Sequence, residues 1–115
     1  MKTSLNADDY QMPHSHYKMS YKGLEIFPYK HLCYLNGTPL ALTQTEYSIL
    51  QTLMESCGQA VSSKEISERV WNDAVYISRN DSIAVHVRHL REKLHDTLKP
   101  FDYVKTVWGI GYVLE

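Results

Sequence analysis

Apolar residues recur along the chain in two periods, and the period changes near residue 42. Before that point Leu24 and Ile26 alternate with other residues, and a second apolar run follows at residues 32–35. Asn36-Gly37 then precedes a third apolar run. An Asn-Gly pair between apolar runs is typical of a two-residue hairpin turn, because both of its residues must adopt a positive φ. The pattern predicts a small antiparallel sheet over residues 21–42.

Two helices are predicted next, because the same start signal occurs twice. Thr43 to Glu46 and Ser62 to Glu65 each place a hydroxyl side chain three residues before a glutamate, which is the pattern of a capping box. Apolar residues at helical spacing follow each start, as far as Cys57 and Trp71. Residues 72–80 are polar and irregular, and they predict a loop.

A third and longer helix is predicted from Ser82 to about Leu98. Its apolar side chains share one face, because they stand at i, i+4, i+7 and i+11: Ile83, Val87, Leu90 and Leu94. Arg, His, Ser and Val side chains occupy much of the remaining surface. Such a surface suits a DNA major groove, where Arg pairs with guanine and Val contacts a thymine methyl group. A solvated helix face has the same composition, so the pattern alone leaves both interpretations open.

The two ends of the chain differ in pattern. Apolar runs on either side of Gly109-Ile110-Gly111 predict a C-terminal hairpin with a glycine-containing turn. This GxG is not expected to bind phosphate, because no helix follows it. Residues 1–20 show no periodicity and predict a flexible tail or linker.

Composition narrows the class of protein. The 115 residues are 43% apolar and 22% charged, which fits one soluble globular domain. No apolar run is long enough to cross a membrane, and the first residues do not resemble a secretory signal, so we expect a cytoplasmic protein. In that compartment Cys33 and Cys57 are expected to be free thiols rather than a disulfide.

Charge is distributed unevenly. Residues 79–105 carry six basic and four acidic residues, a net charge of +2, whereas the rest carries six basic and nine acidic residues, a net charge of −3. The total of −1 argues against a general polyanion binder. The positive segment nevertheless contains the predicted third helix.

The order of these elements resembles the winged-helix output domain of OmpR/PhoB-type response regulators, from about Tyr21 to Glu115. Four motifs carry the resemblance in the family's order: Leu42-Thr43 through Glu46 to Ile49-Leu50, Gly58 through Val61-Ser62 to Val70-Trp71, Val85 to Leu94, and Thr106 to Tyr112. The resemblance implies an α+β winged helix-turn-helix: a small N-terminal antiparallel sheet, a three-helix core and a C-terminal hairpin, the wing. It implies a tail over residues 1–20, a domain over residues 21–115, no cofactor and no enzymatic activity.

The implied function is sequence-specific binding of double-stranded DNA and regulation of transcription in a two-component system. The family places the third helix in the major groove and the wing at the neighbouring minor groove. Carried over by position, the residues expected to contact the sugar-phosphate backbone are Trp71, Ser82, His86, Arg88, Arg91, Thr106 and Tyr112. Val85 and His89 are expected to face base edges, and only such contacts read sequence.

Two residues depart from the family's pattern, and one loop carries a further expectation. His89 stands where several relatives have Arg, and a neutral imidazole cannot make the forked pair to guanine, so the target sequence can differ. Trp108 belongs to the candidate DNA-binding set as a wing residue, although the alternating hairpin pattern favours its packing in the core. Val75, Tyr76 and Ile77 form an apolar loop centre where related domains touch RNA polymerase. The alternative is that Tyr76 or Ile77 folds back onto the core.

Two other functions fit part of the sequence. The near-neutral charge, and Trp108 at a wing position that is often Arg in the family, favour a protein-interaction module on the same fold, with weak or lost DNA binding. His86, His89 and His95 suggest a metal enzyme, but no adjacent carboxylate or cleft signature accompanies them.

Full-length family members also carry a phospho-acceptor domain, for which these residues leave no room. We therefore expect a fragment or a stand-alone module that binds direct-repeat half-sites as a dimer.

Overall fold

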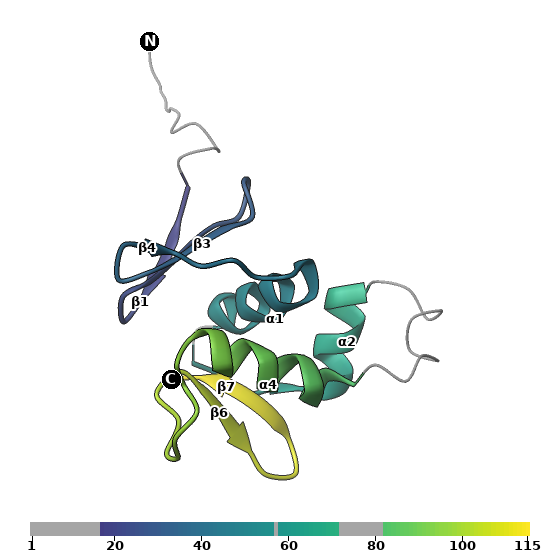
Figure 1. The fold of residues 1–115 in the computed structure, drawn as a ribbon. Coiled ribbons are helices and arrows are strands. Elements are labelled where there is room, and N and C mark those ends of the chain that lie inside the picture. Colours follow the sequence, from purple (N-terminus) through teal and green to yellow (C-terminus); the bar gives the residue numbers. More distant parts are fainter. Residues whose placement is uncertain (1–16, 57, 72–81) are drawn as a thin grey trace. The chain divides into compact units, whose positions relative to one another are not determined.

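The structure is a computed structural model, and it describes residues 17–56, 58–71 and 82–115. The chain divides between Ala41 and Leu42 into two compact units. The described part of the first unit is built of strands, and the second unit holds the helices and the C-terminal hairpin (Figure 1). This combination confirms the predicted α+β class.

The first unit is a four-stranded antiparallel sheet in the order β1-β2-β3-β4. Its strands are β1 (Met19–Tyr21), β2 (Leu24–Phe27), β3 (Leu32–Leu35) and β4 (Thr38–Pro39). Leu24 and Ile26 are fully buried, as their alternation predicts. Ile26 pairs with Cys33, so the buried thiol lies on the same face of the sheet. β1 begins inside the segment that the sequence predicts as a tail.

Two turns of the same kind connect the outer strand pairs. Asn36 and Gly37 have φ values of 51° and 83°, which confirms the predicted hairpin turn between β3 and β4. Lys22 and Gly23 form a matching turn between β1 and β2, with φ values of 49° and 86°. The sequence gives little indication of this second turn, because a Lys-Gly pair is a weaker turn signal than Asn-Gly.

Three helices lie in the described part of the second unit: α1 (Gln44–Glu55), α2 (Ser63–Trp71) and α4 (Ile83–Lys93). The capping box of α1 is complete, because the N–H of Glu46 donates to Thr43 Oγ1 and the N–H of Thr43 donates to Glu46 Oε1. The N–H of Glu65 donates to Ser62 Oγ, which confirms the start of α2. α1 packs against both other helices.

Helix α4 ends five residues earlier than predicted, at Lys93 rather than Leu98. Two hydrogen bonds close it, from the N–H of Asp96 to the carbonyl oxygen of Arg91 and from the N–H of His95 to that of Glu92. This is a Schellman motif, with His95 in the left-handed region at φ 58°. The prediction was wrong because His95 takes the place that glycine usually marks, while Leu98 prolongs the apolar spacing.

A three-stranded sheet completes the second unit in the order β5-β7-β6. Its strands are β5 (Val61–Ser62), β7 (Gly111–Leu114) and β6 (Val104–Val107). β6 and β7 form the predicted wing hairpin. β5 pairs with β7, and a Cβ atom on residue 111 would overlap the carbonyl oxygen of Val61. This position therefore requires glycine.

Candidate nucleic-acid interface

The outer face of α4 is set by its buried face. The four residues of the predicted apolar ridge are at most 4% exposed: Ile83, Val87, Leu90 and Leu94. This ridge packs toward α1 and α2. Val85 and Arg88 are consequently exposed, and His86 and His89 are half-buried. The structure therefore presents these four predicted site residues on one short helix.

Arg88 and His89 lie together on the exposed surface, with 3.5 Å between Arg88 Nη2 and His89 Nε2. Among the described residues, no ion pair involves Arg88. Its positive charge is thus available to an external anion. Ser82 caps the helix by accepting a hydrogen bond from the N–H of Val85 at 3.3 Å, so its hydroxyl oxygen has a structural role as well.

Trp71 and His86 connect the last turn of α2 to the first turns of α4. Their ring centroids are 5.9 Å apart and the rings meet edge to face. This contact places both predicted site residues at the junction of the two helices. Edge-to-face aromatic contacts favour one relative orientation, so the pair helps to fix how α4 is presented.

Arg91 points from α4 to the wing. Its Nε donates to the carbonyl oxygen of Val104 at 2.9 Å, and its Nη2 donates to Thr106 Oγ1 at 3.0 Å. Its guanidinium carbon lies 3.7 Å from the ring centroid of Phe101 and 5.7 Å from that of Tyr112. Burial lowers the pKa of Arg91, although the charges of Tyr112 and Asp96 oppose the shift. These contacts give Arg91 a structural role that the resemblance did not include.

Asp96 holds the start of the wing and was not among the predicted site residues. It is 2% exposed, and its carboxylate accepts hydrogen bonds from the N–H groups of Asp102, Tyr103 and Val104 at 2.5, 2.9 and 2.9 Å. An acidic residue just after a helix is a weak signal, because its backbone partners are six to eight residues away. The carboxylate joins the end of α4 to β6.

The wing brings two predicted residues together and exposes a third. Thr106 and Tyr112 are cross-strand partners in the hairpin. Trp108 lies in the turn between the strands and is 86% exposed. The expectation that Trp108 packs in the core was wrong, because strand alternation stops at Val107 and the turn residue faces outward.

Glu46 and Lys93 form a partly buried ion pair at 2.6 Å that joins the first turn of α1 to the end of α4. Burial raises the pKa of Glu46, but the hydrogen bonds from Lys93 and Thr43, together with the charge of Lys93, outweigh burial. The net effect is a pKa below the ordinary value of 4.5. The pair fixes the helix that carries Arg88 and His89.

The remaining predictions fall outside this surface. Val75, Tyr76 and Ile77 lie outside the described residues. His95 is exposed and follows the end of α4, whereas the sequence pattern predicts it nearer the core side of that helix. Among the residues that the structure describes, no three His, Cys, Asp or Glu side chains form a possible metal site. None of the helices in the described segments is long and apolar enough to cross a membrane.

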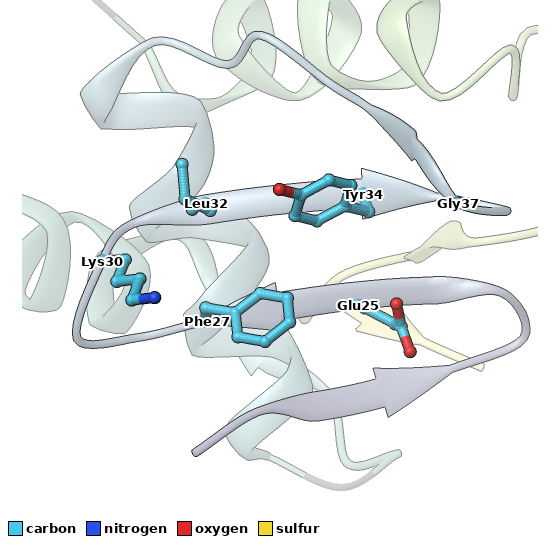
Figure 2. A pocket seen from close by; sticks show the side chains of 6 residues that line it. All are labelled: Glu25, Phe27, Lys30, Leu32, Tyr34 and Gly37. Carbon is cyan, nitrogen blue, oxygen red and sulfur yellow. The ribbon is translucent and has the colours of Figure 1, made fainter. Parts of the chain in front are cut away.

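A separate hollow lies on the first unit. Figure 2 shows the side chains of Phe27, Leu32 and Tyr34 on one face of β2 and β3, with Glu25 and Lys30 at its margins. Its volume is about 260 Å³, and the rings of Phe27 and Tyr34 meet edge to face at 5.8 Å. No residue of the predicted DNA-binding set lines it.

Comparison with known proteins identifies the family. Residues 37–114 match the sequence family described as "Transcriptional regulatory protein, C terminal". The chain belongs to this family. A transcriptional regulatory C-terminal domain is the predicted resemblance, so the comparison confirms it.

One curated regulatory protein is similar to most of this chain. Regulatory protein VanR from Enterococcus faecium is 47% identical over 95 residues, which cover 83% of this chain and 41% of VanR. The chain therefore spans about two fifths of the length of this curated relative.

Two solved structures of DNA-binding domains share the fold of this chain. The DNA-binding domain of CpxR from E. coli has a TM-score of 0.71 and 29% identity, and covers 85% of this chain and 95% of its own. The DNA-binding domain of RstA from Klebsiella pneumoniae, solved in complex with the RstA box, has a TM-score of 0.75 and 26% identity over 86% of this chain and 97% of its own. These matches confirm the predicted winged-helix fold.

Proposed function

We propose that this chain binds double-stranded DNA in a sequence-dependent manner through α4 and the wing, as the effector domain of a response regulator that controls transcription. The observation that carries the proposal is the outer face of α4. There Val85, Arg88 and His89 stand clear of the core because the opposite face is buried. A helix of this kind fits the major groove, and its length suits a single recognition helix.

Each side chain has a distinct proposed role. Arg88, His86 and Ser82 contact the phosphate backbone and set the register of the helix, as do Trp71, Thr106 and Tyr112. Val85 contacts a thymine methyl group, and His89 reads a neighbouring base edge. Arg91 acts mainly as a positioning residue, because its fork already holds Val104 and Thr106 of the wing.

Several further properties belong to the same proposal. The domain acts without enzymatic activity, in the cytoplasm, and a dimer occupies two direct-repeat half-sites. Two linked copies bind more tightly than one, because the second contact is made at a high effective concentration. Val75, Tyr76 and Ile77 are proposed to touch RNA polymerase.

The test is DNA binding as a function of salt. Duplexes are first selected from a randomised library by the wild-type chain, and their affinity is then measured by fluorescence anisotropy. The logarithm of the affinity should fall linearly with the logarithm of salt concentration. Arg88→Ala should weaken binding to all selected duplexes and reduce the slope by about 0.9 for one lost phosphate contact. Lys30→Ala removes the same charge from the first unit and should change neither.

His89→Ala tests sequence reading. It should relax preference at one base pair by about 1–3 kcal/mol and leave the salt slope unchanged. Equal binding of the wild type to selected duplexes and to unselected duplexes of the same library would refute sequence-dependent binding. Absence of binding even at low salt would favour the interaction-module alternative, for which the hollow lined by Phe27, Leu32 and Tyr34 is a candidate contact surface (Figure 2).

A further inference from the structure

The tip of the wing is apolar and uncharged. Trp108, Gly109 and Ile110 join β6 to β7, and Trp108 is 86% exposed while Ile110 is 57% exposed. Within the described part of the chain, no other large hydrophobic side chain is as exposed as Trp108. Exposure of so much indole surface to water is unfavourable, so this tip indicates a contact surface.

The turn itself keeps Trp108 outside. The N–H of Ile110 donates to the carbonyl oxygen of Val107 at 2.9 Å, and Gly109 has a φ of 78°. This is the pattern of a type II turn, in which Trp108 occupies the second position and the third requires a positive φ. Because paired strands hold both ends of the turn, Trp108 can reach the core only if the turn breaks.

The positive charges near the tip are carried outside the turn. Lys99 and Phe101, which precede β6, line a hollow of about 250 Å³ together with Lys105 and Trp108 of the hairpin. Arg91 in turn is engaged with Val104 and Thr106. The three turn residues carry no charge, whereas Lys105 lies on β6. A narrow minor groove attracts inserted cations through its negative potential, and the tip itself offers none.

We propose that Trp108, with Ile110 beside it, enters the minor groove and inserts between two base pairs as an apolar wedge. This inference rests on the proposed function. An inserted apolar side chain partly unstacks one base step and bends the duplex toward the major groove. Pyrimidine–purine steps are the easiest to kink. The wing then selects a flexible step, and this selectivity is independent of the bases that α4 reads.

The experiment measures bending and step preference together. The duplexes are those selected by the wild-type chain from a randomised library, with a fluorescent donor and acceptor at their ends. Wild-type binding should raise energy transfer. Replacement of a pyrimidine–purine step at the wing's position in a selected duplex by AA should weaken binding. Trp108→Ala should lower affinity roughly tenfold, remove the bend and remove the step preference. Its salt slope should not change, because no phosphate contact is lost.

Two further variants complete the test. Trp108→Arg should steepen the salt slope without restoring the bend. Leu98→Ala is the matched control, because Leu98 is 82% exposed but lies outside the wing tip, and it should behave as the wild type. An unchanged thermal midpoint confirms that each variant is folded.

Two results would overturn the wedge. One is a duplex that stays straight in the wild-type complex, and the other is a Trp108→Ala variant that keeps the bend and the step preference. In both cases, salt-dependent binding that is lost in Arg88→Ala would still support the proposed function. A wild-type chain that binds no duplex would overturn both.

Discussion

Replacement of Arg91 tests how the wing is held against α4. Arg91→Met keeps most of the apolar stem and removes the guanidinium. The variant loses the hydrogen bonds to Val104 and Thr106, at 2.9 and 3.0 Å, and the contact with Phe101 at 3.7 Å. Among the described strands, β6 lies at the edge of its sheet, so none of them can pair with the carbonyl oxygen of Val104 in place of Arg91.

The size of the effect follows from these contacts. A hydrogen bond from a charged donor contributes about 1.5 kcal/mol or more, and a cation over an aromatic ring about 0.5–1 kcal/mol at a partly exposed site. Relief from the desolvation of the guanidinium offsets part of the loss. We therefore expect Arg91→Met to lower the free energy of unfolding by about 2–3 kcal/mol. Arg91→Lys should lose about half as much, because an ammonium keeps the charge but not the fork.

Urea denaturation followed by far-ultraviolet circular dichroism measures this loss, which should shift the midpoint without changing the m-value. Arg88→Met is the matched control, since Arg88 is exposed, and its stability should change by less than about 0.5 kcal/mol. The reasoning is refuted if Arg91→Met unfolds at the wild-type midpoint while its salt slope for DNA binding falls by about 0.9. That result would make Arg91 a phosphate contact and nothing more.

Three other predictions concern the internal contacts. Asp96→Ala should lower the free energy of unfolding by about 3 kcal/mol, because three N–H groups lose their acceptor, and urea denaturation measures it. The stability that Glu46 contributes is present above its unfolded pKa and is lost as pH falls through its lower folded pKa. The difference in unfolding free energy between wild type and Glu46→Gln should therefore shrink below about pH 4.5. Burial raises the pKa of Cys33 to about 11, so iodoacetamide should label it only in unfolded protein, as followed by peptide mass spectrometry.

Each of these has a contrary result. Wild-type stability in Asp96→Ala would show that the backbone N–H groups find water instead. A difference between wild type and Glu46→Gln that stays constant with pH would mean that the ion pair with Lys93 adds nothing. Rapid labelling of Cys33 in the folded protein would show that its sheet opens readily.

Local signals predicted the elements whose stabilising contacts are close in sequence. The Asn36-Gly37 turn, the capping box at Thr43 and the buried face of α4 all follow from neighbours within four residues. The end of α4 could not be predicted in the same way, because His95 adopts a backbone conformation that its side chain does not favour. The apolar spacing continues through Leu98 although the helix does not.

Contacts between distant segments account for the remaining differences. Arg91 meets β6 at a separation of 13 to 15 residues, and Asp96 binds backbone groups across the following loop. Neither side chain carries a pattern that names its partner. The pairing of β5 with β7 is hidden for the same reason, since Val61 and Ser62 also read as a helix start. Trp108 was misplaced because the alternation of a strand says nothing about where its turn begins.

The order of strands in the C-terminal sheet has a consequence for synthesis. β7 is the middle strand, and β5 and β6 each pair with it but not with each other. A nascent chain whose α2 and α4 have already left the ribosome still lacks β7. This strand pairs with β5, just before α2, and with β6, the other strand of the wing. Assembly of the sheet must therefore wait until Gly111 to Leu114 has emerged, so a premature stop before Gly111 would leave both outer strands without a partner.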